Sequence, residues 1–265
     1  MKIPMGHPRA ESLQVRERVI EQCAQGVVTP AGLIAHGRGE AFDYLLGEKT
    51  TRSALRAIEA AAVALLVAGR PVISVNGNVA ALAAEEIVRL SEIVGAKIEV
   101  NLFYRSLGRE KAIQRLLEKA GAREIMGVGE DASARIPELA SERRRVDPRG
   151  IYIADTVLVP LEDGDRTEAL VRMGKTVISV DLNPLSRTAQ KASITIVDNI
   201  VRAAPKLVQA AQKLRGEGKE KSRLVRVDFD NEKNLDESIM LINKRLSKLA
   251  KERKHLTLEG ERLDL

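Results

Sequence analysis

Three short apolar runs in the second half of the chain each end abruptly in a cluster of polar residues. They cover residues 153–160, 175–181 and 193–197 and are rich in β-branched residues. Runs of this kind are typical of strands buried on both faces of a parallel sheet. Ligands of open α/β sheets bind at the carboxyl ends of such strands, so the three polar clusters predict one composite site.

An alternation of strand-like and helix-like segments begins at residue 71. The predicted strands are 72–75, 97–102 and 123–128 with the three runs above, and the predicted helices are 79–94, 109–120, 166–173 and 205–215. This alternation indicates an α/β fold, a parallel sheet with right-handed crossovers and flanking helices. The charged stretch 129–150, bounded by proline and glycine, is predicted to be a surface excursion.

Two helices are predicted before the sheet, at residues 10–25 and 52–69. The first is amphipathic, and Arg16 lies in the middle of its apolar face. Arg16 either extends outward along this face or points across it into a site. Between the two helices, Gly37 and Gly39 bracket Arg38, which allows the backbone to approach a ligand closely. An ordinary loop before a helix is the alternative.

A C-terminal helix is predicted after a polar linker at residues 216–222. Asn234 and Glu237 have the spacing of a capping box, and apolar residues then recur at four-three spacing. Two heptads are too few for a coiled coil, so this helix is expected to pack on the body or on a second subunit. The expected organisation, as one compact domain, is an N-terminal helical segment (1–70), an α/β body (71–215) and a C-terminal linker, helix and tail (216–265).

Composition narrows the class of protein. Hydrophobic residues make up 44% of the chain, as in a globular protein, and Cys23 is its single cysteine, which excludes a disulfide framework. Aromatic residues make up only 2%, which argues against stacking on single-stranded nucleic acid. The net charge of +6 favours phosphorylated small molecules as readily as nucleic acid. Without a long apolar run or a signal-peptide core, the protein is expected in the cytoplasm.

Two nucleotide-binding motifs are absent. Residues 173–176, Met-Gly-Lys-Thr, end like a P-loop, but position 169 is alanine and Lys175 begins a predicted strand rather than a helix. No G-x-G-x-x-G sequence follows a predicted strand, so the standard dinucleotide fingerprint is missing.

The polar clusters at the strand ends supply the candidate ligands. Asp165 and Glu168 have the spacing of an N-terminal capping pair, which leaves Glu162, Asp163 and Arg166. The two remaining carboxylates either help to hold Mg²⁺ indirectly, receive an amine, or are solvated loop acids.

Arg187 is the phosphate candidate of the next cluster. Asn183 is expected to cap a helix with Pro184 at its first position, which places Arg187 in the first turn. A cation there opposes the helix dipole unless an anion binds. Residues 198–202 form a similar polar cluster after the next strand, with Arg202 in the corresponding place. Pro205 indicates that the following helix begins after an irregular turn.

No Ser-His-Asp or Cys-His arrangement stands out, so the chemistry is expected to rest on arginines, backbone amides and a metal-bound nucleotide. Long blocks of the chain also resemble the archaeal phosphopantothenate synthetases, from about His7 to Lys254. The blocks are residues 32–45, 74–82, 101–105, 159–175, 181–187 and 195–203.

The resemblance implies a homodimer with a Rossmann-like body and a defined reaction, that of a 4-phosphopantoate–β-alanine ligase in coenzyme A synthesis. ATP activates the carboxylate of 4-phosphopantoate as an acyl-adenylate and releases diphosphate. The amine of β-alanine then attacks, which gives 4′-phosphopantothenate and AMP.

The resemblance also implies the site residues. The family pattern places ATP, with Mg²⁺ held mainly through its phosphates, against Arg16, Arg38, Asp181, Leu182, Asn183, Arg187, Thr188, Asn199 and Ile200, which favours the inward orientation of Arg16. From their positions in the matched blocks, the candidates for binding phosphopantoate are His36, Gly37, Asn76 and Asn78. The candidates for catalytic contacts, including binding of the amine, are His36, Glu162 and Asp163.

Two other classes compete with this interpretation. A non-catalytic or dinucleotide-dependent Rossmann-like nucleotide-binding protein would need the glycine fingerprint that is missing. A nucleic-acid-associated protein is suggested by the basic runs 143–145 and 219–221, but acids flank the first run and interrupt the second, and neither nucleic acid nor a membrane is expected as a partner.

Overall fold

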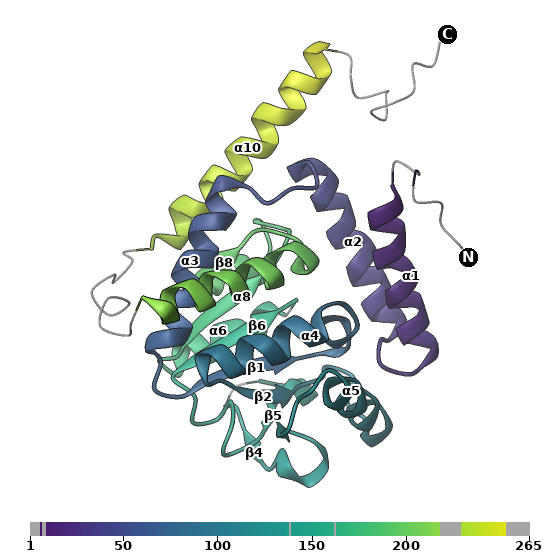
Figure 1. Cartoon of the computed structure of the whole chain (residues 1–265), viewed down its shortest axis with the longest axis vertical. Helices are drawn as coiled ribbons and strands as arrows, with labels where there is room; N and C mark the ends of the chain where they lie inside the picture. The colour runs from purple at the N-terminus through teal and green to yellow at the C-terminus, as the bar shows by residue number, and fades with distance from the viewer. Residues whose placement is uncertain (1–5, 7–8, 138, 162, 218–228, 253–265) are drawn as a thin grey trace.

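Six parallel strands form the main sheet of the computed structural model, which describes Gly6 and residues 9–137, 139–161, 163–217 and 229–252 (Figure 1). In sheet order they are β3 (Ile125–Met126), β2 (Lys97–Val100), β1 (Pro71–Val75), β6 (Thr156–Pro160), β7 (Thr176–Val180) and β8 (Ile194–Ile196). The predicted α/β fold with a Rossmann-like parallel sheet is therefore confirmed. Several strands are shorter than predicted at their ends, because the chain turns at residues 150–153 and after residue 100.

The direction in which strands are added reverses between β1 and β6. Val72 of β1 pairs with Lys97 of β2 on one side and with Val157 of β6 on the other. Counted along the chain, the order is 3-2-1-4-5-6, the doubly wound order in which ligands bind outside the carboxyl ends of the strands at the reversal. The fold thus predicts a site next to the ends of β1 and β6.

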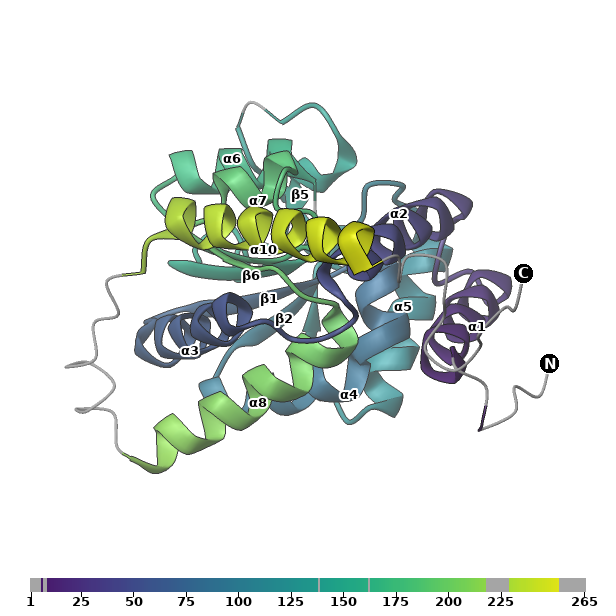
Figure 2. The same cartoon turned by 90° about the horizontal axis from the view of Figure 1, so that it is seen from above.

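Helices cover both faces of the sheet (Figure 2). Strand side chains alternate between the faces, so that Ile73 and Ile178 join one buried cluster while Val72 and Val177 join another. The first face carries α3 (Arg52–Val67), α4 (Gly77–Val94), α5 (Leu107–Lys119) and α8 (Ile200–Gly216). The second face carries α6 (Gly164–Arg172) and α7 (Arg187–Lys191), and α10 (Asn231–Glu252) lies at the β8 edge. None of the described helices is long and apolar enough to span a membrane.

Two further helices, α1 (Ala10–Ala24) and α2 (Pro30–Leu46), lie beside α4 (Figure 1). The segment around Arg38 forms neither the expected close approach of a free backbone nor the alternative, an ordinary loop, because Gly37 and Gly39 lie inside α2. Its start carries ordinary helix signals, since Thr29 caps the amide of Gly32 and proline occupies the first helical position. The backbone amides around Arg38 are therefore used within the helix, which leaves the side chains of α2 available for other contacts.

The stretch between β3 and β6 is more than a surface excursion. It contains η1 (Gly129–Asp131), β4 (Ala134–Arg135), η2 (Glu142–Arg144) and β5 (Arg145–Val146), with β4 and β5 antiparallel. Ile136, Val146 and Ile151 are buried against the second face of the sheet. The prediction of a surface segment is therefore wrong for its apolar side chains, which complete this core.

The predicted caps of α6 and α7 are displaced. Asp163, rather than Asp165, caps α6 by accepting a hydrogen bond from the amide of Arg166 (3.0 Å). The helix expected at Pro184 begins at Arg187, where Ser186 is the cap, and Asn183 instead accepts from the amide of Leu185 (2.9 Å).

Two later helix starts also differ from the sequence interpretation. Helix α8 begins directly at Ile200, with Asn199 as its cap and Pro205 inside it, so there is no irregular first turn. Helix α10 begins at Asn231, and Asn234 is not a cap, because its amide group donates to the carbonyl of Thr195 (2.9 Å).

Candidate active site

A cavity of about 640 Å³ opens at the carboxyl ends of the strands. Most of the predicted site residues line it: His36, Arg38, Asn76, Asn78, Asp163, Asp181, Leu182, Asn183, Arg187, Thr188, Asn199 and Ile200. Gly37 and Arg16 are not among its lining residues, and Glu162 lies outside the described residues. Segments that are far apart in sequence thus converge at the expected place, while the roles of these residues stay predictions.

Arg16 reaches the rim of the cavity through another side chain. Its guanidinium donates two hydrogen bonds to the carboxylate of Glu40, at 2.8 and 2.9 Å, and Glu40 lines the cavity. Burial alone would raise the pKa of Glu40, but hydrogen bonds from Arg16 and Tyr44 overcome it and hold the pKa below its usual value. Arg16 therefore stabilises an ionised carboxylate beside the cavity.

His36 projects from α2 as a half-buried imidazole. Burial lowers its pKa below 6.5, Glu40 partly opposes this effect, and Arg16 adds to it. It makes no hydrogen bond with any other residue that the structure describes. At neutral pH His36 is therefore an uncharged imidazole that can accept a proton.

The turn after β7 is held by its own side chains. Asp181 accepts hydrogen bonds from the amide of Asn183 (2.9 Å) and from the hydroxyl of Ser186, and burial raises its pKa against these bonds. Because Ser186 also caps α7, this turn is fixed on one wall of the cavity.

Two arginines beside this turn differ in their partners. Arg187 pairs with Asp165 and with Glu168 (2.6 Å), and the hydrogen bond to Glu168 raises its pKa. These carboxylates already compensate a cation at the start of α7, so its position does not by itself require a bound phosphate. Arg38, in contrast, is exposed on α2 and forms no ion pair with the described residues. Arg38 is the more available cation for a polyphosphate.

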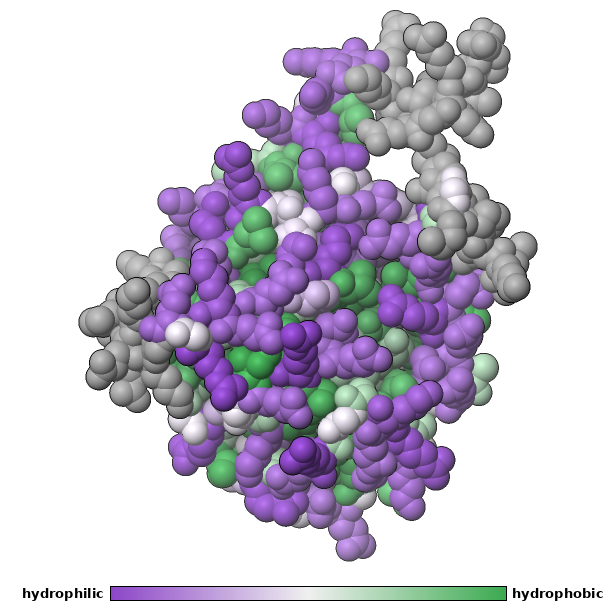
Figure 3. All heavy atoms as spheres, viewed as in Figure 1, coloured by the Kyte–Doolittle hydropathy of each residue, from purple (hydrophilic) through white to green (hydrophobic). Residues whose placement is uncertain are grey.

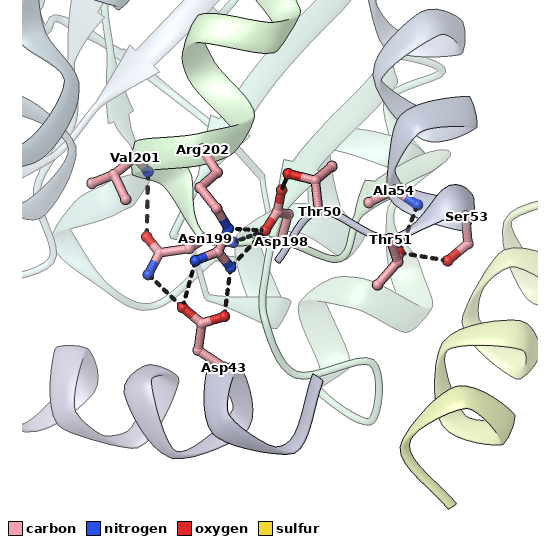
Figure 4. Close-up of polar contacts among 9 residues, drawn as sticks. All are labelled: Asp43, Thr50, Thr51, Ser53, Ala54, Asp198, Asn199, Val201 and Arg202. Atoms are coloured by element: carbon pink, nitrogen blue, oxygen red, sulfur yellow. Dashed lines mark hydrogen bonds and ion pairs between the residues drawn. The ribbon is translucent and has the colours of Figure 1, made fainter. Parts of the chain in front are cut away.

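An ion-pair network fixes the start of α8 (Figure 4). Arg202 of α8 lies between the carboxylates of Asp43, on α2, and Asp198, and Thr50 donates to Asp198 (2.6 Å). Asn199 donates to Asp43 (2.9 Å) while its carbonyl oxygen caps the amide of Val201. Both ends of the Asn199 side chain are thus occupied, which holds the start of α8 against the cavity.

The two asparagines after β1 join segments at the sheet reversal. Asn76 caps α4 at the amide of Val79 and donates to the carbonyls of Pro160 and Leu161, at 3.2 and 2.9 Å. Asn78 donates to the carbonyl of Gly32 (2.9 Å), which ties α4 to α2. The structure therefore gives both side chains a positioning role, which is compatible with a lining role.

Other cavity residues escape the sequence reasoning. Arg109 of α5, Arg143 of η2 and the aromatic pair Phe103 and Tyr104 line the cavity. Arg143 lies in the basic run that the sequence suggests is solvated, yet it is only 7% exposed. The aromatic pair directly follows a predicted strand, and this position at a strand end is the sequence feature that could have identified it as part of the site. Nothing local in the sequence marks Arg109 or Arg143.

Comparisons with known proteins match this chain over most of its length. The family model "Phosphopantothenate/pantothenate synthetase" matches residues 53–245. The chain is 53% identical to a 4-phosphopantoate–β-alanine ligase of Thermococcus onnurineus, over 94% of this chain and 95% of the relative. Relatives with the same name from Thermococcus kodakarensis and Methanosarcina mazei are each 52% identical, over 95% and 94% of this chain and 96% and 98% of theirs. With a matching family model and near-full-length relatives, the chain belongs to the phosphopantothenate/pantothenate synthetase family.

Proposed function

We propose that this protein is an ATP-dependent ligase that joins 4-phosphopantoate to β-alanine in coenzyme A biosynthesis. The observation that carries the proposal is the 52–53% identity, over 94–95% of the chain, to relatives that bear this name. The cavity supports it, because four arginines line a single space at the sheet reversal, where a nucleotide and an anionic acid can meet: Arg38, Arg109, Arg143 and Arg187.

The reaction proceeds in two steps. The carboxylate of 4-phosphopantoate attacks the α-phosphorus of ATP, which forms the acyl-adenylate and releases diphosphate. The amine of β-alanine then attacks the acyl carbon, which forms the amide and releases AMP. Mg²⁺, bound through the ATP phosphates, would neutralise charge on the leaving diphosphate.

The residues around the cavity suggest how the chain assists these steps. The ATP side is assigned to Arg38, the turn 181–183, Thr188 and the start of α8, which surround one wall. The amine must lose a proton to be nucleophilic, and neutral His36 is a suitable acceptor. Asp163 is less available, because one carboxylate oxygen caps α6 and the other pairs with Arg143 (2.8 Å).

The assembly is proposed to be a homodimer in the cytoplasm. Helix α10 extends beyond the body of the molecule (Figure 1), and its exposed side chains include Ile239 (38% exposed) and Leu246 (41% exposed), which lie seven residues apart on one face of the helix. Figure 3 shows the same face as largely hydrophilic, with hydrophobic residues in small areas. Ile239 and Leu246 continue the helix face on which Leu235 is buried, and an apolar strip that runs beyond the body of the molecule supports the use of α10 as a subunit contact.

One assay tests the proposed reaction. The purified protein is incubated with ATP, Mg²⁺, 4-phosphopantoate and β-alanine, and nucleotide products are separated by chromatography. We expect AMP and 4′-phosphopantothenate in equal amounts, and no AMP when the acid is omitted. ADP in place of AMP would indicate an acyl-phosphate, and no dependence on the acid would contradict the ligase assignment.

A further inference from the structure

We propose that Arg109, seated against the first turn of α4 and supported by Arg143, binds the phosphate group of 4-phosphopantoate and makes the ligase prefer the phosphorylated acid. This inference rests on the proposed function and assigns one end of the same cavity. It concerns two residues that lie on the β2–β3 side of the sheet reversal.

Arg109 has a charge that the described residues leave uncompensated. Its guanidinium donates to two neutral carbonyl oxygens, those of Val27 (3.0 Å) and Tyr104. Its Nε is buried without a hydrogen-bond partner, and no carboxylate pairs with it in the part of the chain that the structure describes. Burial and the neighbouring Arg143 both lower its pKa, so a bound anion would relieve an unfavourable environment.

The start of α4 adds to this positive environment. A Cβ placed on Gly77, the first residue of this 18-residue helix, would lie 3.1 Å from Nη2 of Arg109 and would collide with the carbonyl oxygen of Val27. The guanidinium therefore lies directly against the helix N-terminus, where amide groups and the helix dipole favour an anion. Two independent sources of positive potential thus meet at one point of the cavity wall.

Arg143 is held rigidly on the same side. Its Nη1 donates to the carbonyl of Asn101 (3.1 Å), and Asn101 donates back to the carbonyls of Arg143 and Arg145. Its Nε lies 2.8 Å from a carboxylate oxygen of Asp163. These contacts fix the guanidinium at the cavity without a conformational change, as a preorganised phosphate site requires.

The shape of the acid fits this placement. 4-Phosphopantoate carries a phosphate at one end, a carboxylate at the other, and two methyl groups between them. Leu102 and Leu161 supply apolar surface to the same cavity. With the phosphate at Arg109, on the β2 side, the carboxylate points toward the β7–β8 side, where ATP is assigned.

The test compares two acids and two arginines of α5. For Arg109→Gln we expect kcat/KM with 4-phosphopantoate to fall about 10- to 100-fold, the usual effect of losing charged hydrogen bonds. The lower kcat/KM with unphosphorylated pantoate and the KM for ATP should stay unchanged, and Arg109→Lys should recover part of the loss. Arg115→Gln, an exposed position of the same helix outside the cavity, should match the wild type.

A second measurement uses the wild-type protein alone. Inorganic phosphate should inhibit competitively against 4-phosphopantoate and not against ATP.

Two outcomes would contradict the proposal. Equal losses of kcat/KM for both acids in Arg109→Gln would show a merely structural role, and phosphate inhibition competitive with ATP would place the triphosphate at Arg109. Either result overturns the phosphate subsite while the wild type still makes 4′-phosphopantothenate. A wild type without ligase activity would instead contradict the proposed function as well.

Discussion

Glu99, at the residue scale, is a carboxyl group with no contact with solvent. It lies on β2 at 0% exposure and accepts hydrogen bonds from the amides of Asp147 (3.0 Å) and Ile151 (2.6 Å). Burial raises its pKa to about 7, and these two hydrogen bonds only partly oppose that effect. Glu99 thus anchors the segment that carries Arg143, and its protonation state changes near neutral pH.

This raised pKa predicts a pH-dependent stability. Between the ordinary pKa of 4.5 and about 7, the folded protein binds more protons at Glu99 than the unfolded chain does. The free energy of unfolding should therefore be highest at acidic pH, where Glu99 is protonated in both states. It should fall by roughly 3 kcal/mol as pH rises through this range. Urea unfolding at a series of pH values should show this fall in the wild type but not in Glu99→Gln, and parallel curves would refute the prediction.

The two arginines near the assigned ATP position predict unequal effects. Arg38→Ala should raise the KM for ATP about tenfold, since it removes an exposed cation that forms no ion pair with the described residues. Arg187→Ala should have a smaller effect, because Asp165 and Glu168 already neutralise that guanidinium. Steady-state kinetics with varied ATP test the ranking, which the reverse order would contradict.

At the element scale, a single side chain joins the ends of β1 and β6. Asn76 combines a helix cap with two hydrogen bonds to the carbonyls of Pro160 and Leu161. Leu161 has a φ of +53°, which is unusual for a bulky residue, and its hydrogen bond from Asn76 holds this turn.

Removal of this side chain should be more damaging than loss of an ordinary cap. For Asn76→Ala we expect the free energy of unfolding to fall by about 2–3 kcal/mol, since one buried and one part-buried carbonyl group lose a donor in addition to the loss of the cap. Ser106→Ala, which removes a cap of α5 and little else, is the matched control at about 1 kcal/mol. Equal losses in chemical denaturation would show that the bridge adds nothing.

The strands and the position of the site are predictable from sequence, whereas the supporting contacts are not. Short β-branched runs such as 176–180 are stable only as strands of a parallel sheet that is buried on both faces. The polar residues that follow such strands must lie together at the carboxyl edge of that sheet. Helix α2 is not predicted from sequence because its glycines have low helix propensity. Close packing outweighs this propensity in the folded protein, since a Cβ at Gly32 would collide with Asn78. Burial of Arg143 depends on Asn101, 42 residues away, so no local pattern reveals it.

At the scale of the whole molecule, the cavity requires both halves of the sheet. The β1–β3 half supplies α4, α5 and the segment with Arg143, and the β6–β8 half supplies the turns at Asp163, Asp181 and Asn199. Helix α2 spans both halves through Asn78 and through Asp43. The same assembly leaves α10 projecting at the β8 edge.

The projecting helix predicts how subunits associate. Glutamate at Ile239 and Leu246 together should convert the proposed homodimer into a monomer, because charged groups cannot be buried in an apolar contact without a large desolvation penalty. Light scattering coupled to size-exclusion chromatography measures the mass. Ser247→Glu, at an exposed polar position of the same helix, should stay dimeric, and an unchanged mass in the double variant would place the contact elsewhere.

Helix α2 also restricts how this chain can change in length. It meets the cavity at intervals of three or four residues, including Gly32, His36 and Gly39. A single residue inserted before Ala35 would rotate the side chains on the N-terminal side of the insertion by about 100° relative to those on its C-terminal side, because a helix has 3.6 residues per turn. Gly32 and His36 could then no longer face the same cavity. Insertions and deletions should therefore be excluded from this segment, although a loop with the same glycines would absorb them.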